Sequence, residues 1–318
     1  MRLTPYNATS MNDGNSQSGD KYLDEVSRNL GWVTSGEQER LRKKRVAIAG
    51  LGGVGGDHFL TLIRLGIERF NLSDFDSFET VNFNRQTGAT RSSVGRPKLD
   101  VMIKLALDIN PNLDIRRFPN GVTTENTQAF LTDVDIYIDG LDFFAVNARR
   151  AVFSACNRMK IPAITAAPLG MGVAWLNFLP GRMSFEEYFR MEGHSESEQL
   201  VRFLVGLAPS ALHSSYLVDP STIDLKNHKG PSTRMACQMC AGVAGTEALK
   251  ILLGRGEIQS APVSLHFDVY LNRFKRSWLP WGNANPLQRI RLSIGRKKLL
   301  NALVESKGSN RNSVPDAA

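Results

Sequence analysis

Residues with the chemistry to hold a nucleotide are concentrated between positions 45 and 98. The apolar segment 46–49 runs into a turn with the spacing G-x-G-x-x-G, whose glycines are Gly50, Gly52, Gly53 and Gly55. A second apolar segment, 70–73, is followed by Asp74 and Asp76. Such a turn lets backbone N–H groups approach a phosphate at the start of a helix, and an acid about 20 residues further on can hold ribose hydroxyls. By itself this pattern is typical of an NAD-binding enzyme.

A polar and basic cluster behind the turn changes that interpretation. Asn82, Arg85 and Gln86 lie within one short segment, and Lys98 follows Pro97. Two cations beside a phosphate-binding turn suit a triphosphate, whereas a nicotinamide cofactor has no use for them. The cluster therefore favours ATP over NAD.

The elements that must position these residues alternate between strand and helix. Further strands are expected at 115–118, 134–139 and 161–166, and helical patterns separate them. Thr34 is expected to cap a helix, because Glu37 follows three residues later. This order predicts an α/β fold with a doubly wound, mostly parallel, Rossmann-like sheet and helices on both faces.

The second half of the chain departs from this rhythm. Residues 181–236 contain polar stretches with Pro and Lys, and a long insertion in a compact fold is usually an active-site lid or a disordered segment. A helical pattern at 240–253 and a hairpin pattern at 263–274 follow. The chain is therefore divided into a disordered leader (1–19), an ATP-binding core (20–180), a crossover or lid insertion (181–236), a C-terminal part of the same domain with a helix and a β-hairpin (237–300), and a disordered tail (301–318).

Composition places the chain among soluble globular proteins. Its 318 residues are 42% hydrophobic and 22% charged, which is ordinary for that class. No apolar run approaches the roughly 18 residues that cross a bilayer, the N-terminal residues lack the apolar core of a secretory signal, and three cysteines do not make a disulfide framework. We expect a cytoplasmic protein that has no contact with a membrane.

The net charge of +8 comes partly from a basic run near the C-terminus. Its members are Arg289, Arg291, Arg296, Lys297 and Lys298. Such a run is usually a solvated face, and the alternative is a set of phosphate contacts with nucleic acid.

Five blocks of sequence, in order, resemble the ThiF/MoeB/HesA family, which is related to the adenylation domain of ubiquitin-activating enzymes. The blocks are the glycine turn 50–55, Asp74-Phe75-Asp76, Asn82-Phe83-Asn84-Arg85-Gln86, Gly95-Arg96-Pro97-Lys98 and Asp139-Gly140-Leu141-Asp142. The resemblance covers about residues 28–253. It implies an enzyme that binds ATP and Mg²⁺ and transfers AMP to a carboxylate with release of pyrophosphate. The expected partner is the C-terminus of a small ubiquitin-like protein or peptide.

The resemblance also assigns roles to the basic and amide residues. Arg85 and Lys98 would neutralise the triphosphate, because attack of a carboxylate on the α-phosphorus brings two anions together. Asn82 and Gln86 would position the nucleotide beside them.

Three acids and one further arginine complete the implied site. Asp74 would take the ribose hydroxyls, and Asp76 is either a second nucleotide contact or the cap of a turn. Asp142 would help to hold Mg²⁺, which prefers oxygen ligands. Arg28 would reach across a homodimer to the ATP of the partner subunit.

A two-fold homodimer is therefore expected. Its shared face would include the helix that carries Phe59, Leu62 and Ile63, which supplies the apolar material for a large interface.

Cysteine chemistry is where the chain departs from the family. Members with a structural Zn²⁺ carry two C-x-x-C pairs, whereas this chain has one, Cys237 and Cys240, and Cys156 lies elsewhere. The histidines of the insertion are His194, His213 and His228. Their spacing matches no zinc motif, so a structural zinc is unlikely and the cysteine pair is expected to be buried packing. Because 181–236 contains no cysteine, a thioester relay is not expected.

Three other functions stay open. A branch of the same family activates a carboxylate on a modified tRNA base and dehydrates it, in the manner of threonylcarbamoyladenosine cyclisation, and a charge of +8 would suit tRNA. An NAD-dependent oxidoreductase is supported only by the glycine turn and the acids. A non-catalytic binding module would have no need of Arg85, Lys98 and Asp142 together.

Overall fold

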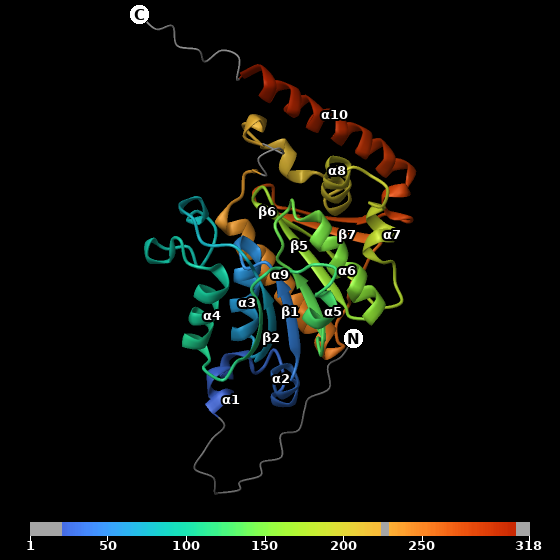
Figure 1. Ribbon diagram of the computed structural model, residues 1–318. Coiled ribbons are helices and arrows are strands. Elements are labelled where there is room, and N and C mark those ends of the chain that lie inside the picture. The colour runs from blue at the N-terminus through green and yellow to red at the C-terminus, as the bar shows by residue number, and fades with distance from the viewer. Residues whose placement is uncertain (1–20, 224–228, 310–318) are drawn as a thin grey trace, which may run out of the picture.

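A computed structural model of the chain describes residues 21–223 and 229–309. One eight-stranded sheet organises them, in the order β3-β2-β1-β4-β5-β6-β7-β8 (Figure 1). Strands β1 to β5 are parallel: β1 (Arg45–Ala49), β2 (Arg69–Ser73), β3 (Asp114–Phe118), β4 (Ile136–Asp139) and β5 (Ala163–Leu169). Their carboxyl ends therefore meet at one edge of the sheet. The expected doubly wound, mostly parallel fold is confirmed.

An antiparallel extension continues the sheet beyond β5. It consists of β6 (Gly172–Phe178), β7 (Val263–Asp268) and β8 (Arg273–Trp278). The hairpin expected at 263–274 is present, but its second strand begins only at Arg273. Strand β6 was not predicted. All seven of its residues are buried, and a short apolar run of this kind cannot be told from a buried helical segment by periodicity alone.

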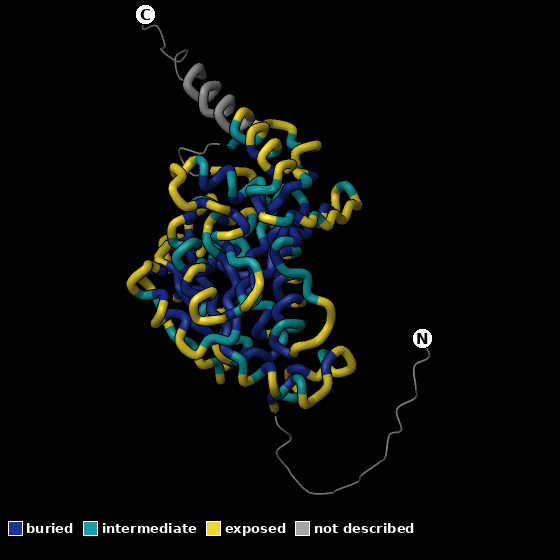
Figure 2. The backbone as a smooth tube through the Cα atoms, turned by 90° about the vertical axis from the view of Figure 1, so that its right-hand side faces the viewer, coloured by how far each residue is buried: buried dark blue, intermediate teal, exposed yellow. Residues whose placement is uncertain are grey.

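Helices cover both faces of the sheet, since successive strand residues point to opposite sides. Val46 and Ile48 belong to a core cluster with α3 (Gly53–Arg64), α4 (Lys98–Ile109) and α9 (Arg234–Leu253). Ala47 and Ala49 belong to a second cluster with α5 (Thr127–Phe130), α6 (Val146–Met159), α7 (Phe185–Phe189) and α8 (Glu196–Leu207). Figure 2 shows the buried backbone running through the middle of the molecule between these layers.

The apolar residues of α3 that were expected at a dimer interface lie in the core instead. Phe59 and Leu62 are fully buried and Ile63 is nearly so, within the cluster that α3 forms with the sheet and α9. These three side chains are therefore part of the hydrophobic core of a single chain. The expectation that they line a dimer face is therefore wrong.

Helix α9 is long and apolar enough to span a membrane by length and composition alone. It packs on α3 and β5, and a Cβ on Gly245 would come within 3.1 Å of Thr61 Cγ2 on α3. Its small residues Ala241, Ala244 and Ala248 are buried in this contact layer. The helix is thus a core element of the fold.

The insertion is a folded layer rather than a polar lid over its described part. Besides α7 and α8 it contains the 3₁₀ turns η4 (Leu212–Ser215) and η5 (Pro220–Thr222). Phe185 and Phe189 of α7 and Phe203 of α8 are buried in the second core cluster. In the sequence, the polar capping residues and the charged residues on the outer faces of α7 and α8 make these apolar side chains hard to recognise. Residues 224–228, and with them His228, lie outside the described residues.

The two ends of the chain differ from each other. At the N-terminal side, α1 (Lys21–Glu25) and η1 (Ser27–Asn29) precede α2 (Ser35–Arg42), and the capping box of Thr34 and Glu37 is confirmed by N···O distances of 2.9 and 3.2 Å. The expected leader 1–19 lies outside the described residues. At the other end, η6 (Gly282–Ala284) leads into α10 (Pro286–Ser309), which packs on α8. Residues 301–309 are therefore helical rather than disordered, as their helix-forming Leu, Ala, Glu and Lys allow, and 310–318 lie outside the described residues.

Candidate active site

The glycine turn between β1 and α3 is closed against the turn that follows β4. A Cβ on Gly50 would meet the carbonyl of Gly140, and a Cβ on Gly55 or on Gly140 would meet the carbonyl of Gly50. Gly50 also has a φ of +83°, which only glycine adopts without strain. Helix α3 begins at Gly53, so its free N–H groups follow a turn whose own glycines carry no side chains. This geometry fits a phosphate.

Asp74 stabilises the turn from the end of β2. Its Oδ2 accepts a hydrogen bond from Leu51 N at 2.6 Å, and its Oδ1 accepts one from Asp76 N at 2.8 Å. Burial raises the pKa of Asp74, and the two backbone donors act against that rise. Each oxygen retains a lone pair for a ligand, so the carboxylate is held in place at the position expected for a ribose contact.

Lys98 and Asp76 form an ion pair at the start of α4. Lys98 Nζ lies 3.0 Å from Asp76 Oδ2, and the lysine side chain is 9% exposed whereas the aspartate is 52% exposed. Lys98 N also donates to Asp76 O at 2.8 Å. The ammonium is therefore anchored from its own loop.

Arg85 has no carboxylate partner among the described residues. Its Nη1 donates to Val81 O at 3.0 Å and to Asn84 Oδ1 at 2.9 Å. The stem of Arg85 lies beside the glycine turn, because a Cβ on Gly53 would be 3.7 Å from Arg85 Cγ. A guanidinium held by neutral oxygens next to a phosphate-binding turn keeps its charge available for an anion.

The two amides flanking Arg85 differ in their contacts. Gln86 is buried, and its Oε1 has no hydrogen-bond partner within the described part of the chain; a Cβ on Gly52 would lie 3.4 Å from Gln86 Nε2. Asn82 ends the 3₁₀ turn η2 (Thr80–Asn82), where its Oδ1 accepts from Glu79 N at 3.0 Å. Gln86 therefore faces the turn with an unused acceptor, whereas Asn82 shapes its own loop.

Asp142 lies after β4, next to the glycine turn. Gly50 and Leu141 are so close that a Cβ on the glycine would be 3.0 Å from Leu141 Cα. Asp142 is exposed, and its Oδ1 accepts from Phe144 N at 3.0 Å. Mg²⁺ is commonly held by one or two carboxylates together with substrate phosphates, so a single exposed carboxylate beside a phosphate-binding turn fits that ion.

Arg28 is not brought to this site. It is exposed on η1, which is attached to the far end of α3 by the hydrogen bond of Asn29 Nδ2 to Arg64 O at 3.3 Å. Helix α3 has 12 residues, so about 18 Å of helix separates the two ends. Within one chain Arg28 therefore lies away from the glycine turn.

A second arginine that the sequence did not single out supports the Arg85 loop. Arg234, the first residue of α9, donates from Nη1 to Asp57 Oδ2 at 2.5 Å and to Arg85 O at 3.0 Å. Asp57 also accepts a short hydrogen bond from Thr87. Asp57 and Arg234 are 177 residues apart, and no local signal in the sequence relates them.

Cys237 and Cys240 are buried, as expected, and so is Cys156. Burial raises the pKa of the thiols of Cys156, Cys237 and Cys240. Cys237 lies against the glycine turn, with Sγ 3.1 Å from where a Cβ on Gly53 would be. Within residues 21–223 and 229–309, no group of three or more His, Cys, Asp and Glu side chains could hold a metal ion. The ring of His213 packs instead 6.0 Å from that of His266.

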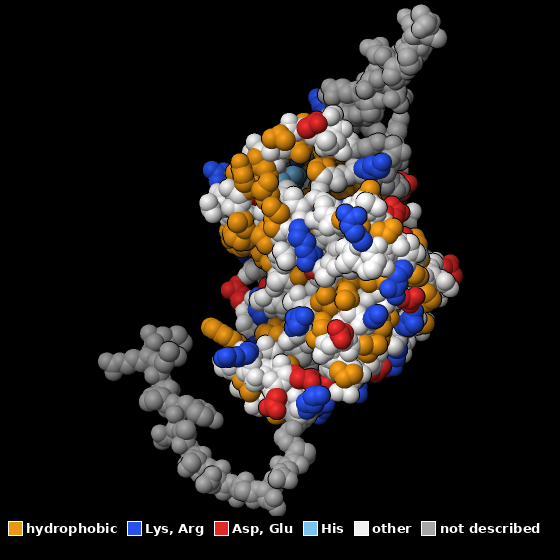
Figure 3. All heavy atoms as spheres, turned by 90° about the vertical axis from the view of Figure 1, so that its left-hand side faces the viewer, with side chains coloured by type: hydrophobic (Ala, Val, Ile, Leu, Met, Phe, Trp, Pro, Cys, Tyr) orange, Lys and Arg blue, Asp and Glu red, His pale blue; other side chains and the backbone are white. Residues whose placement is uncertain are grey.

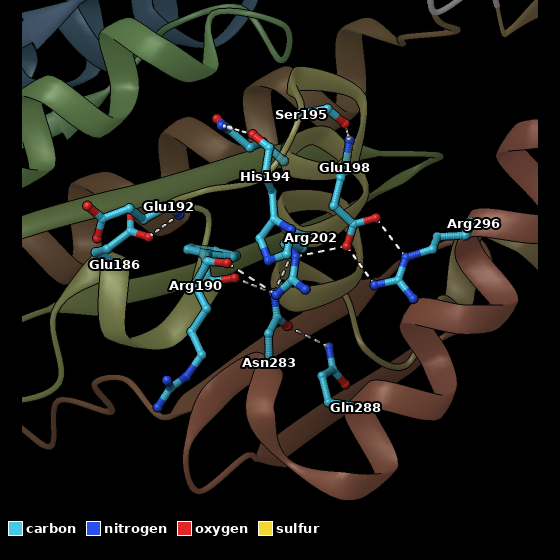
Figure 4. A network of polar contacts seen from close by, with 12 residues as sticks. Glu186, Arg190, Glu192, His194, Ser195, Glu198, Arg202, Asn283, Gln288 and Arg296 are labelled. Carbon is cyan, nitrogen blue, oxygen red and sulfur yellow. Dashed lines mark hydrogen bonds and ion pairs between the residues drawn. The ribbon is translucent and has the colours of Figure 1, made fainter.

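A cavity of about 1090 Å³ lies away from these residues, between α7, α8 and α10. Figure 4 shows the polar network beside it, where Glu198 accepts from Arg202 and Arg296 at 2.6–2.8 Å. His194 lines this cavity, and none of the predicted nucleotide-binding residues does. Arg202 lines the cavity. The next residue, Phe203, packs on Phe143, which follows Asp142 in the sequence, with 5.7 Å between the ring centres. Helix α8 therefore separates the cavity from the candidate active site.

Comparison with known proteins identifies one family over most of the chain. The model of the ThiF family matches residues 26–287. The tRNA threonylcarbamoyladenosine dehydratase of Bacillus subtilis is 32% identical over 145 residues, which are 45% of this chain and 56% of that protein. The sulfur carrier protein ThiS adenylyltransferase of Escherichia coli is 30% identical over 135 residues, 42% of this chain and 53% of that protein. The chain thus spans about half the length of these curated relatives.

Solved structures support the fold. A crystal structure of E. coli MccB with ATP has a TM-score of 0.59 at 18% identity, covering 83% of this chain and 72% of that one. The E. coli tRNA N6-threonylcarbamoyladenosine dehydratase has a TM-score of 0.54 at 20% identity, covering 75% and 98%. At these identities the likeness concerns the arrangement of strands and helices.

Proposed function

Because the chain belongs to the ThiF family, we propose that it is an ATP-dependent adenylyltransferase that activates a carboxylate as an acyl-adenylate and releases pyrophosphate. The observation that carries the proposal is a glycine turn in which Gly50 and Gly55 have no room for a side chain, flanked by an arginine with no carboxylate partner among the described residues and by a buried lysine. That combination fits a triphosphate.

The residues would divide the work as follows. The backbone of the glycine turn and the start of α3 receive the phosphates, while Asp74 holds the ribose. Arg85 and Lys98 stabilise the negative charge that grows when a carboxylate oxygen attacks the α-phosphorus and the bond to pyrophosphate breaks. Asp142 would hold Mg²⁺, which supplies further positive charge to the phosphates.

The proposed carboxylate is the C-terminus of a small protein or peptide. The names of similar proteins point to such molecules. One is an adenylyltransferase of a sulfur carrier protein, and another, MccB, was crystallised together with MccA. Since ATP is the cosubstrate, we place the reaction in the cytoplasm.

A pyrophosphate-exchange assay tests the proposal. The enzyme, ATP, Mg²⁺ and candidate small proteins or peptides are incubated with labelled pyrophosphate, and label should enter ATP only with the correct carboxylate. Arg85→Ala should abolish exchange, whereas Arg91→Ala should not, because Arg91 is an exposed residue of the 3₁₀ turn η3 (Arg91–Ser93). NADH formation without exchange would indicate an oxidoreductase instead.

The alternative substrate is a carboxylate on a modified tRNA base. It is favoured by the dehydratases among the relatives and by the basic residues at the start of α10. Against it, the face drawn in Figure 3 shows lysine and arginine side chains scattered among acidic and apolar ones, with no continuous basic stripe. Exchange that depends on tRNA rather than on a peptide would establish this alternative.

We further propose that the enzyme is a homodimer in which Arg28 acts on the nucleotide of the partner subunit. Its position at the far end of α3 keeps Arg28 from the site of its own chain, so a contact with ATP requires a second subunit. Arg28→Ala and Lys98→Ala would each inactivate the enzyme, and a mixture with exchanging subunits should recover part of the activity, because one mixed site carries neither substitution. A monomer in sedimentation experiments at micromolar concentration would refute the dimer.

A further inference from the structure

Arg149 of α6 binds the turn that carries Asp142. Its Nε donates to Asp139 Oδ2 at 2.7 Å, its Nη2 donates to Leu141 O at 2.7 Å and to Asp142 O at 3.0 Å, and its Nη1 donates to Phe143 O at 3.3 Å. One guanidinium therefore binds four residues among five consecutive positions. Only the planar, five-donor arginine side chain can make such a set of contacts.

The pair of Arg149 and Asp139 is buried. Arg149 is 2% exposed and Asp139 is 3% exposed. Asp139 Oδ2 also accepts from Thr165 Oγ1 at 2.9 Å, and its Oδ1 accepts from Leu141 N at 3.2 Å and from Tyr137 OH at 3.3 Å. Each nitrogen of the Arg149 guanidinium and each oxygen of the Asp139 carboxylate therefore has at least one hydrogen-bond partner, which favours a single conformation of the buried ion pair.

These contacts determine where the carboxylate of Asp142 lies. Arg149 holds the main-chain carbonyl of Asp142, and the side-chain Oδ1 is held by Phe144 N. Oδ2 has no hydrogen-bond partner among the described residues. The turn therefore presents one free carboxylate oxygen from a backbone that is clamped on the protein side.

Helix α8 holds Arg149 from the other side. The Arg149 guanidinium carbon lies 4.5 Å from the centre of the Phe203 ring, a cation–π contact. Phe203 belongs to the insertion and also packs on Phe143. The insertion is therefore coupled through this ring to the turn after β4.

We propose that Arg149 is a positioning residue for Mg²⁺·ATP, and that Phe203 of the insertion fixes Arg149 in the conformation that presents Asp142. This inference rests on the proposed nucleotide function. It adds two residues, one of them from the insertion, that touch neither ATP nor the metal.

The test measures Mg²⁺-dependent binding of ATP by calorimetry, together with pyrophosphate exchange. Arg149→Lys keeps the positive charge but cannot reach all four acceptors, so the Mg²⁺ concentration for half-maximal ATP binding should rise about tenfold, as for other residues that orient metal ligands. Phe203→Leu keeps an apolar side chain without the ring face, and its shift should be about threefold. Binding of ATP without Mg²⁺ should be unchanged in both variants.

Arg150→Lys is the matched control, because the neighbouring Arg150 is only partly buried and pairs with Glu186 at 3.1 Å, away from the turn. It should leave the Mg²⁺ dependence unchanged. Equal shifts in Arg149→Lys and Arg150→Lys, or a loss of Mg²⁺-free ATP binding as large as the loss with Mg²⁺, would overturn the inference. If Arg149→Lys fails to fold, the result for Phe203→Leu, which leaves the ion pair intact, decides alone. If the wild-type protein does not bind ATP at all, both the proposed function and the inference are wrong. If the wild type binds ATP normally and Phe203→Leu leaves the Mg²⁺ concentration for half-maximal binding unchanged, only the inference is wrong.

Discussion

Replacing Lys98 by methionine should remove the reaction without removing the fold. The substitution keeps the length of the buried stem and deletes the ammonium that lies 3.0 Å from Asp76 Oδ2. Because Asp76 is 52% exposed, water can replace the lost partner, and the free energy of unfolding should fall by no more than about 1 kcal/mol. The transition state would lose one charged contact, which costs on the order of 2.7–4 kcal/mol, or about 10²–10³-fold in rate.

The assay is pyrophosphate exchange at saturating ATP, with urea unfolding of the same samples. Lys104→Met is the matched control, because Lys104 is an exposed residue of the same helix α4 and its loss should leave exchange unchanged. Asp76→Asn breaks the same ion pair while keeping the ammonium, so its unfolding free energy shows what the pair alone contributes to stability. Exchange by Lys98→Met within about threefold of the wild type would refute the assigned charge stabilisation, since the cost expected of one lost contact is far larger.

Three further predictions concern cysteine chemistry, pH and helix capping. Replacing Cys156, Cys237 and Cys240 together by alanine should leave exchange active, because the buried thiols have raised pKa values; a stoichiometric zinc signal in the wild type, or loss of exchange in the variant, would contradict this. His58 is fully buried without a hydrogen-bond partner among the described residues, and burial lowers its pKa to about 3. An unfolded histidine binds a proton below its ordinary pKa of 6.5 whereas the folded one does not, so the free energy of unfolding should fall by up to about 1.4 kcal/mol per pH unit between pH 6.5 and 3 on account of this group. His58→Met should reduce that slope in urea titrations at pH 6.5 to 5, and an unchanged slope would show that another group is responsible. Thr34→Ala should cost about 1 kcal/mol of stability in thermal unfolding and Thr34→Ser much less, since serine keeps the capping oxygen; equal losses would exclude the cap as the cause.

Sequence reasoning located the part of the site whose residues are neighbours along the chain. The glycine turn, Asp74 and the Arg85 segment are each short blocks with a local physical reason for their residue types. Arg149 and Arg150 stand side by side and look alike in the sequence, yet Arg149 is buried in the turn and Arg150 is partly exposed. Only the packing of α6 on the sheet decides which of the two faces inward.

For the fold, too, the elements that were predicted from the sequence are those with a local signal. Apolar runs separated by helical patterns predicted the parallel strands, and the cap signal predicted α2, because these signals are local. Strand β6 is an apolar run that no helical pattern separates from β5, and α7 and α8 have charged outer faces that concealed their phenylalanines. The contact between Arg234 and Asp57 depends on the approach of α9 to α3, which no pattern within either segment specifies.

Gly50, Gly55 and Gly140 occupy one shared space where two turns meet. A side chain on any of them would displace the backbone of another, and shortening a neighbouring side chain cannot compensate, because the atoms that it would meet belong to the backbone. We therefore expect all three glycines to be retained in functional variants of this sequence, and the backbone of the turns after β1 and β4 to be conserved together. Gly36, where a Cβ would meet nothing within 4 Å, is under no such restriction and should drift freely in a library of functional variants.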